Sequence, residues 1–321
     1  MKKILVTGSA GQIGSELTMA LRERYGNDRV VAGGRKTKPS AKLRESGPFE
    51  IVDCTDIKAV EKVVKRYEID TIYHLAALLS AVAEARPQLA WDVNINGLYN
   101  VLEVAREYKC AVFTPSSIGA FGLSTPQDNT PQDTIQRPNT MYGVTKVAGE
   151  LLCDYYYKRF GVDTRGVRYP GIISNVTLPG GGTTDYAVEI FYEAIKHKKY
   201  TCFIKEGTKM DMMYMPDALK AAFDLMEADP GKLKHRNAFN VTAMSFAPEE
   251  IAAEVKKHIP EFTMDYKVDP VRQAIAESWP NYMDDSVARR EWGWHPEYDL
   301  PAMSKDMIKV LSEKLQVSDA V

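Results

Sequence analysis

The sequence contains few cysteines and histidines, and neither residue type is clustered. The four cysteines lie far apart and form no CxxC pair, and the spacing of the five histidines matches no zinc site. Disulfide-stabilised folds and zinc centres both depend on such clusters. We therefore expect reduced thiols, a cytoplasmic protein and chemistry without a metal.

The sequence also lacks a long apolar run and a block of charge of one sign. No stretch approaches the ~20 apolar residues that cross a bilayer, and the start, MKKILVTG, lacks the apolar core of a signal peptide. The 41 basic and 43 acidic residues give a formal net charge of -2. This balance argues against nucleic acid or a membrane as the partner. We expect a soluble protein with a small-molecule substrate.

Short apolar segments alternate with helical patterns in the first half of the chain. Strands are expected at 4–7, 29–32, 50–52, 71–75, 111–114 and 163–169, and a long helix at 141–159. Apolar strands that alternate with helices are typical of a parallel sheet covered on both faces. Because crossovers between parallel strands are right-handed, the pattern predicts an α/β fold of Rossmann type, with a doubly wound parallel sheet.

The pattern becomes less regular after about Pro170. Proline and glycine punctuate residues 178–182, and mixed short elements follow. We therefore predict a Rossmann domain at residues 1–172 and a smaller, mainly substrate-binding region at 173–321. Some later segments, such as 216–226 and 238–242, are expected to return to the Rossmann sheet.

Three glycines stand at the turn between the first strand and the first helix. Gly8, Gly11 and Gly14 form the spacing GxxGxxG in TGSAGQIG. In dinucleotide-binding folds such glycines allow a tight turn, close approach to the pyrophosphate and close packing of helix on strand. The N–H groups at the start of the helix then face the phosphates. The pattern predicts an NAD(P)-binding domain in which the pyrophosphate is held by Gly8, Gly11, Gln12, Ile13 and Gly14.

The position that selects the ribose of the cofactor has no acidic residue. Folds that bind NAD usually carry Asp or Glu at the end of the second strand, whereas this chain has Gly34 followed by Arg35. Arg35 fits a ligand for a 2′-phosphate, a partner stacked on adenine, or a solvated loop charge. Asp53, just past the third strand, is a candidate partner for the adenine amino group. NAD is the expected cofactor, and NADP stays open.

Tyr142 and Lys146 lie four residues apart on a predicted helix and so share a face. An alcohol that loses hydride must also lose a proton, and a free tyrosine, with a pKa of about 10, is a poor base at neutral pH. A nearby ammonium favours the phenolate. YxxxK strings also occur by chance, but this one follows the predicted strand that runs into Ser116-Ser117. We predict Tyr142 as the base, Lys146 as its activator and Ser117 as the group that orients the reacting hydroxyl.

These residues belong to a wider set of motifs. The set comprises TGSAGQIG, Asp53, His74–Ala77, Asn94–Gly97, Ser117, Tyr142 with Lys146, and Arg168–Gly171. With it the chain resembles the extended short-chain dehydrogenase/reductase superfamily, which includes the UDP-sugar epimerases. A second, more specific set comprises Ala76–Ala81, Pro170–Ser174, Gly180–Ala187 and Glu277–Pro280. With both sets, the chain is similar to the short-chain-type L-threonine 3-dehydrogenases from its first strand to about residue 300.

The resemblance implies NAD-linked, metal-free oxidation of the threonine β-hydroxyl to 2-amino-3-oxobutyrate. It also implies a homodimer formed by two long helices, near residues 98–109 and 142–159. Gly34 is the departure, because the family usually carries the NAD-selecting aspartate there. The further dinucleotide contacts that the resemblance implies are Leu75, Ala76, Ala77, Asn94, Ser116, Tyr142, Lys146, Tyr169, Pro170 and Ile172.

The resemblance also implies a set of substrate contacts. L-Threonine is a small zwitterion, so its site needs hydroxyl and N–H donors for the carboxylate and a cover that excludes water. Thr184 precedes a predicted helix, 185–194, whose first N–H groups suit a carboxylate, and Trp279 is suited to closing the pocket. From the residues alone, it is simpler to interpret Thr184 as the N-cap of the helix and Trp279 as a core side chain. Only the resemblance to the family favours substrate contacts over these structural roles. The implied contacts are Ser80, Ser117, Tyr142, Gly182, Thr183, Thr184 and Trp279.

Two other functions stay open. A nucleotide-sugar epimerase or dehydratase uses the same Tyr/Lys pair but needs room and basic groups for a nucleotide diphosphate. The Pro170-Gly171 turn and the segment 180–187 are not expected in the epimerases. The other alternative is a non-catalytic NAD(P)-sensing regulator. Such proteins typically lose the tyrosine or the lysine, and both are present here.

Overall fold

The chain forms two compact units in the computed structural model, which describes residues 3–178 and 182–318. Unit 1 runs to Ala120 and includes Pro138–Arg168 and Leu219–Phe239. Unit 2 comprises Phe121–Arg137, Tyr169–Ala218 and the residues from Asn240 onward. The sequence predicts one main division at residue 172, whereas the chain passes between the units several times.

A six-stranded sheet forms the centre of unit 1. Its strand order is β3-β2-β1-β4-β5-β7, and every pair of neighbours is parallel. The predicted α/β fold of Rossmann type is confirmed by this sheet. The strands are β1 (Ile4–Thr7), β2 (Val30–Gly34), β3 (Phe49–Ile51), β4 (Thr71–His74), β5 (Ala111–Phe113) and β7 (Thr164–Arg165).

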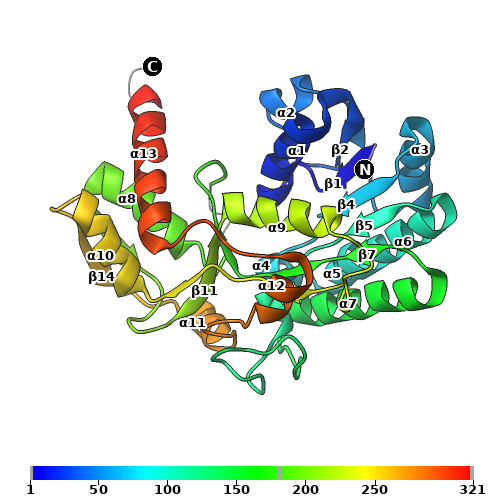
Figure 1. The fold of residues 1–321 in the computed structure, drawn as a ribbon. Helices are drawn as coiled ribbons and strands as arrows, with labels where there is room; N and C mark the ends of the chain where they lie inside the picture. Colours follow the sequence, from blue (N-terminus) through cyan, green and yellow to red (C-terminus); the bar gives the residue numbers. More distant parts are fainter. Residues whose placement is uncertain (1–2, 179–181, 319–321) are drawn as a thin grey trace. The chain divides into compact units, whose positions relative to one another are not determined.

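Helices cover both faces of this sheet, α1 and α2 on one side and α3, α6 and α7 on the other (Figure 1). Leu5, Ile72 and Val112, from three neighbouring strands, share a buried apolar cluster with side chains of α3, α6 and α7. Because side chains alternate across a strand, the residues next to them in β1, β4 and β5 face the other side. The helices and turns of unit 1 are α1 (Gln12–Tyr25), η1 (Asn27–Arg29), α2 (Ala41–Glu45), α3 (Ile57–Tyr67), α4 (Ser80–Ala85), α5 (Pro87–Trp91), η2 (Asp92–Asn96), α6 (Gly97–Tyr108), η3 (Ile118–Ala120) and α7 (Met141–Phe160).

The prediction of one continuous strand over residues 163–169 is wrong at Gly166. β7 ends at Arg165, and β8 (Val167–Tyr169) lies in a separate sheet of order β12-β8-β6, with β6 (Ser116–Ser117) and β12 (Phe239–Asn240). A Cβ on Gly166 would lie 2.3 Å from the carbonyl oxygen of Thr114. The backbone changes its pairing partners at this close approach, where no side chain fits.

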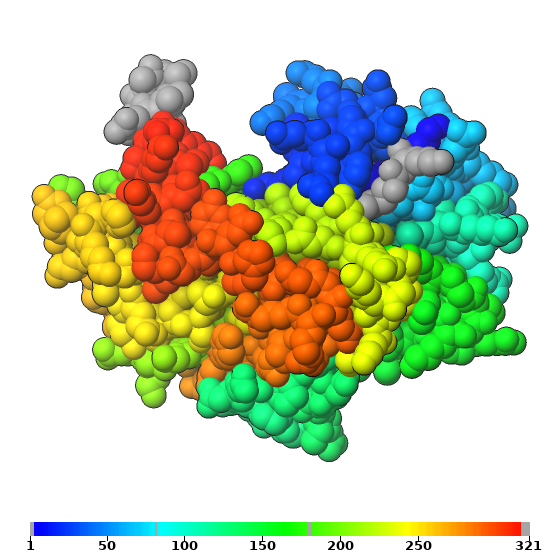
Figure 2. Space-filling view, in the orientation of Figure 1, coloured from blue at the N-terminus to red at the C-terminus, as the bar shows by residue number. Residues whose placement is uncertain are grey.

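Unit 2 has its own core of helices and short sheets. α8 (Tyr186–His197), α10 (Pro248–His258) and α13 (Leu300–Ser318) pack against one another, and Figure 2 shows α13 (red) beside α10 (yellow). The segment 216–226, expected to return to the Rossmann sheet, is instead helical, within α9 (Met215–Glu227), and from Leu219 onward it belongs to unit 1. The remaining elements of unit 2 are β9 (Gly171–Ile173), β11 (Met210–Tyr214) and β13 (Met244–Phe246) in one sheet, β10 (Lys199–Cys202) paired with β14 (Thr263–Tyr266), and the helices α11 (Pro270–Glu277) and α12 (Ser286–Trp292).

The cysteines are all free and buried. Burial raises the pKa of the Cys54 thiol to about 12, so this side chain stays protonated and unreactive near neutral pH. The described residues contain no helix with both the length and the hydropathy that a membrane crossing requires.

Asp211 places a carboxyl group inside the core of unit 2. Its side chain is 1% exposed, shares a short hydrogen bond with Thr242 and accepts one from the Met283 N–H at 2.9 Å. Burial raises the pKa of Asp211 to about 8, because a charged carboxylate loses its hydration there. The carboxyl group is therefore mostly neutral in the folded protein at pH 7.

We predict that Asp211→Asn changes how stability depends on pH. Between about pH 4 and pH 8 the carboxyl ionises only in the unfolded chain. The free energy of unfolding should then fall as the pH rises, by up to about 1.4 kcal/mol per pH unit. A neutral amide removes this contribution, so the variant should gain stability relative to the native chain between pH 5 and pH 8. Denaturant titrations at several pH values measure this, with the surface variant Asp128→Asn as control. Parallel pH profiles for Asp211→Asn and the native chain would contradict the prediction.

Candidate active site

The glycine-rich turn lies between β1 and α1 with almost no free space. Gly8 has a φ of +69°, and a Cβ on Gly14 would lie 2.1 Å from the carbonyl oxygen of Gly8. α1 begins at Gln12 after Gly11, and no side chain caps it. The first N–H groups of a helix have no partners within the helix. Gln12, Ile13 and Gly14 therefore present backbone donors at one point, whereas the Gly11 N–H donates to Gly8 O at 3.0 Å within the turn.

This turn packs directly on the loop that follows β4. A Cβ on Gly8 would meet the backbone of Leu75 and Ala76 at 2.7 Å, and the Leu75 N–H donates to Thr7 O at 3.1 Å. The strand order reverses between β1 and β4, and ligands of open α/β sheets bind at such a switch point. The structure thus brings Leu75, Ala76 and Ala77 beside the glycine turn.

The end of β2 adjoins the same turn. The Ser9 N–H donates to Gly33 O at 3.0 Å, and Arg35 follows directly after the strand. Arg35 Nη1 lies 3.1 Å from Asp53 Oδ2 in an ion pair. Partial burial opposes ionisation of Asp53, but hydrogen bonds from Thr55 and the charge of Arg35 hold the pKa of this carboxyl below its ordinary value. Both predicted residues of the adenosine end thus lie together.

Asn94 lies in η2, a π-helical turn that continues α5 into α6. Its side chain accepts a hydrogen bond from Leu78 N at 2.7 Å and donates to Leu78 O and to Thr145 Oγ1. Thr145 Oγ1 in turn donates to Tyr142 O at 2.8 Å. Asn94, predicted as a dinucleotide contact, therefore ties the loop after β4 to α7. The sequence pattern did not predict this π-helical turn. Such turns are frequent at functional sites.

Tyr142 and Ser117 meet at Gly119, a residue that the sequence analysis missed. A Cβ on Gly119 would lie 3.2 Å from the Tyr142 ring and 3.5 Å from Ser117 Oγ. Ser117 Oγ accepts a hydrogen bond from the Gly119 N–H at 3.1 Å, which leaves its own hydrogen to donate. The phenol is thus packed against the η3 turn, with the serine hydroxyl beside it.

Lys146 lies one helical turn after Tyr142. Its Nζ is 5.4 Å from the centre of the Tyr142 ring and donates to Pro115 O at 2.8 Å. An ammonium at this range interacts favourably with the electrons of a tyrosine ring and favours a negative charge on the phenol oxygen. The predicted Tyr/Lys pair is therefore assembled on one face of α7.

Ser116, predicted as a dinucleotide contact, donates a hydrogen bond to Glu150. Glu150 also pairs with Arg168, whose Nη2 lies 2.8 Å from Glu150 Oε2, and both side chains are 8% exposed. The Arg168–Glu150 pair was not predicted as part of the site. The only feature of the sequence that pointed to this pair was the position of Glu150, four residues after Lys146 on the same predicted helix. The pair fixes the strand end that carries Ser116 and Ser117.

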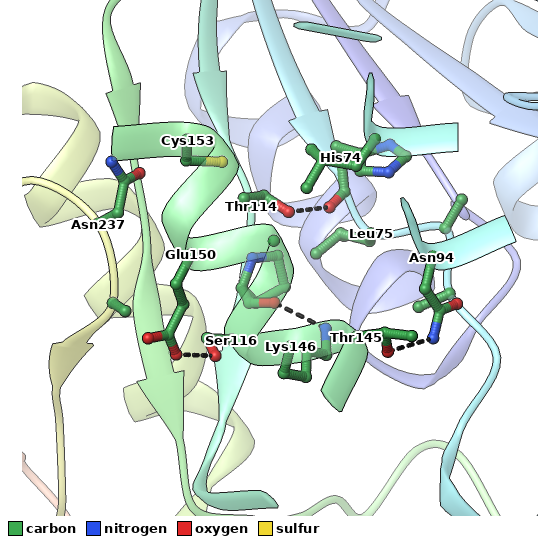
Figure 3. Close-up of a pocket in the computed structure, with 16 residues that line it drawn as sticks. His74, Leu75, Asn94, Thr114, Ser116, Thr145, Lys146, Glu150, Cys153 and Asn237 are labelled. Carbon is green, nitrogen blue, oxygen red and sulfur yellow. Dashed lines mark hydrogen bonds between the residues drawn. The ribbon is translucent and has the colours of Figure 1, made fainter. Parts of the chain in front are cut away.

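A small cavity of about 40 Å³ lies beside Lys146 (Figure 3). Its lining includes six of the predicted dinucleotide contacts, namely Leu75, Ala76, Ala77, Asn94, Ser116 and Lys146. His74 lines it, and the His74 Nδ1 and Thr7 Oγ1 atoms form a hydrogen bond of 2.9 Å. Burial, together with the charge of Lys146, lowers the pKa of His74 to about 3. The imidazole is therefore neutral near pH 7 and serves a structural role.

The other predicted residues belong to unit 2. Gly171 approaches Thr184 so closely that a Cβ would lie 2.6 Å from Thr184 Cγ2. α8 begins at Tyr186, one residue later than expected, because the Asp185 side chain accepts a hydrogen bond from the Gly182 N–H at 2.6 Å. Thr184 therefore precedes the cap of the helix rather than forming it.

Six further residues of the prediction belong to unit 2. The Tyr169 hydroxyl is buried and donates to Ala218 O at 2.6 Å, which occupies it structurally. Pro170 and Thr183 are buried, and Trp279 is half-buried after α11. Ile172 lies in β9, and Gly182 follows Gly180 and Gly181, which lie outside the described residues. In unit 1, Ser80 is half-buried and begins α4.

The residues of the glycine turn fit a dinucleotide. The space where a Cβ of Gly14 would lie is closed by backbone, and the start of α1 presents uncapped N–H groups. Ser9 Oγ, in the same turn, is buried and has no hydrogen-bond partner among the described residues. A pyrophosphate supplies the acceptors that such a turn requires. The part of the chain that is described contains no group of three His, Cys, Asp or Glu residues arranged for a metal ion.

Residues 4–242 match the NAD dependent epimerase/dehydratase family, so the protein belongs to this family of enzymes. Its sequence is 63% identical to the L-threonine dehydrogenase of Clostridium difficile, whose X-ray structure superposes with a TM-score of 0.97 over 98% of each chain. The L-threonine dehydrogenase of Phytophthora infestans is 52% identical, with a TM-score of 0.93 over 97% of this chain and 99% of that one. A Staphylococcus haemolyticus protein described as an uncharacterized epimerase/dehydratase is 57% identical over 316 residues, 98% of this chain and 99% of its own.

These comparisons confirm the resemblance that the motifs indicated. The protein is an enzyme of the NAD dependent epimerase/dehydratase family, and its solved neighbours at high identity are L-threonine dehydrogenases. Its cofactor is a nicotinamide dinucleotide. The comparisons do not choose between NAD and NADP.

We predict that Gly14→Ala weakens dinucleotide binding by tenfold or more. The added Cβ would lie 2.1 Å from Gly8 O and can be accommodated only by moving the turn. Calorimetric titration with NAD and NADP measures the effect. Gly97→Ala is the matched control, because its Cβ would meet Cys54 at an ordinary 3.4 Å. Unchanged binding by Gly14→Ala would remove the turn from the dinucleotide site.

Proposed function

We propose that the protein oxidises the β-hydroxyl of L-threonine to the ketone of 2-amino-3-oxobutyrate. The observation that carries the proposal is the assembly at Gly119, where the Tyr142 ring and Ser117 Oγ lie together with Lys146 one turn away. The dehydrogenation of an alcohol needs these three elements: a base, a cation near that base, and a hydroxyl that positions the substrate. The high similarity to two threonine dehydrogenases supports threonine as the alcohol.

In the proposed reaction the chain provides the base. Tyr142, as phenolate, accepts the proton of the substrate hydroxyl as its C–O bond becomes a carbonyl. Ser117 donates a hydrogen bond to the same oxygen and holds it toward the tyrosine. When bound, the oxidised nicotinamide supplies the acceptor for the hydride from Cβ. Lys146 stabilises the negative charge on the phenol oxygen, and its bond to Pro115 O keeps the ammonium in place.

The proposed substrate contacts have the chemical groups that a small zwitterion requires. Ser80 supplies a hydroxyl in unit 1. Thr183 and Thr184 supply hydroxyls in unit 2, and Trp279 supplies an apolar surface. A nucleotide-sugar substrate would also require a large basic pocket for its diphosphate, whereas threonine requires none. This difference distinguishes the proposal from nucleotide-sugar chemistry. In addition, both Tyr142 and Lys146 are present, which favours an enzyme over a regulator that only senses the dinucleotide.

The proposal is tested with purified protein, L-threonine and either NAD or NADP. The near-ultraviolet absorbance of the reduced nicotinamide should rise with threonine and stay flat with UDP-glucose. Conversion of UDP-glucose, with no reaction of threonine, would establish the epimerase alternative instead. Dinucleotide binding without turnover of either compound would favour the regulator.

We predict that Tyr142→Phe lowers kcat for threonine by about 10²-fold or more, the usual scale for a lost general base. The Phe ring can still pack on Gly119, so the dissociation constant of the dinucleotide should change by only a few-fold. Tyr157→Phe, on the same helix, is the matched control and should retain full turnover. Near-normal kcat in Tyr142→Phe would contradict the proposed base.

We also propose that two copies of the chain associate through α6 and α7. These helices pack side by side, and they carry exposed apolar side chains, with Tyr99 48%, Leu151 62% and Tyr155 52% exposed. Apolar patches of this kind are typical of protein interfaces. A second copy related by a two-fold axis would cover this face with the same face of its partner.

We predict that the protein sediments as a dimer and that the double variant Leu151→Lys/Tyr155→Lys sediments as a monomer. Two introduced ammonium groups would repel across a two-fold interface. Val271→Lys, which replaces an apolar side chain 68% exposed in unit 2, is the control and should leave the dimer intact. A native protein that sediments as a monomer at micromolar concentration would refute the interface.

A further inference from the structure

The loop after β2 is unusually basic. Residues 35–44, which comprise this loop and the start of α2, include Arg35, Lys36 and Lys38 in the loop and Lys42 and Arg44 in the helix, and contain no acidic residue. Arg35, Lys36 and Lys38 are exposed. The first residues of this loop lie beside the glycine turn, because the Ser9 N–H donates to Gly33 O at 3.0 Å. A dinucleotide held by the turn places its adenosine ribose near the end of the second strand.

The end of β2 carries no group that would select a free 2′-hydroxyl. That selection normally requires a carboxylate, which accepts hydrogen bonds from the ribose and repels a 2′-phosphate. Gly34 stands there instead and ends the strand. The carboxylate of Asp53 is nearby, but its Oδ1 already accepts hydrogen bonds from Thr55 and its Oδ2 from Arg35. The pairing with Arg35 offsets the repulsion that Asp53 would exert on a phosphate.

The contact with Asp53 also orders the Arg35 side chain. The guanidinium has five N–H donors, and the contact with Asp53 at 3.1 Å is made by Nη1 alone. The side chain is 36% exposed, so other donors remain accessible to a ligand. A planar guanidinium with several donors suits a phosphate group.

We propose that this site has lost selection for NAD and accepts NADP at least as tightly, with Arg35 as the ligand of the 2′-phosphate. Lys36 adds a second positive charge to the same loop. The proposal concerns the cofactor of the proposed threonine oxidation, but it rests only on dinucleotide binding. It therefore stands or falls separately from the identity of the substrate.

The test is calorimetric titration of the purified protein with NAD and NADP at fixed ionic strength, without threonine. The dissociation constant for NADP should equal or fall below that for NAD. Arg35→Ala should weaken NADP binding by about tenfold or more and change NAD binding by less than threefold. NADP binding tenfold weaker than NAD binding to the native protein would overturn the proposal. An equal loss for both dinucleotides in Arg35→Ala would also overturn it, because the guanidinium would then stack on adenine.

A second pair of variants tests the role of Gly34. Gly34→Asp should weaken NADP binding by at least tenfold relative to Gly34→Asn and strengthen binding of NAD. A Cβ at this position would lie 3.1 Å from the half-buried Phe49 ring, and both variants require the same small shift of that ring. The pair therefore isolates the carboxylate charge. Equal NADP affinities for the two variants would contradict the proposal.

Discussion

The close packing of the glycine turn between α1 and the loop after β4 is the constraint on which the rest of the site depends. A Cβ on Gly14 or on Gly8 would overlap backbone, at 2.1 Å and 2.7 Å respectively. From this fixed point a line of hydrogen bonds leads across the site. Leu78, in the loop after β4, is held by Asn94, which also bonds to Thr145, and Thr145 bonds to the carbonyl of Tyr142. The dinucleotide turn and the helix of the proposed base are thereby held in one rigid arrangement.

The charges around α7 are arranged to keep Lys146 available to Tyr142. Lys146 and Glu150 are four residues apart, a spacing at which opposite charges on a helix usually pair. Here Glu150 pairs with buried Arg168 instead, while Lys146 donates to the neutral carbonyl of Pro115. His74, in the same cavity, is held neutral by burial. The ammonium of Lys146 therefore lies beside the Tyr142 ring, and the salt bridge described for Glu150 is the one with Arg168.

The sequence predicted those parts of the fold and site that depend on neighbouring residues. One short continuous segment of sequence was enough to predict each of these parts: β1, the glycine turn, and the helix with Tyr142 and Lys146. The parts that were missed depend on residues far apart in the chain. Gly119 matters because it touches Tyr142, and Glu150 because Arg168 reaches it. The break at Gly166 arises where the backbone approaches Thr114. No local pattern encodes such contacts, since propensity and periodicity describe only one segment at a time.

In the reaction that we propose, hydride leaves Cβ of threonine while Tyr142 takes the hydroxyl proton. Turnover of L-threonine that carries deuterium on Cβ tests this most directly. Mass spectrometry of the reduced cofactor should show one deuterium gained per molecule reduced, because the bond from Cβ to hydrogen is the bond that breaks. Reduced cofactor without deuterium, or deuterium retained in the amino-acid product, would contradict the account.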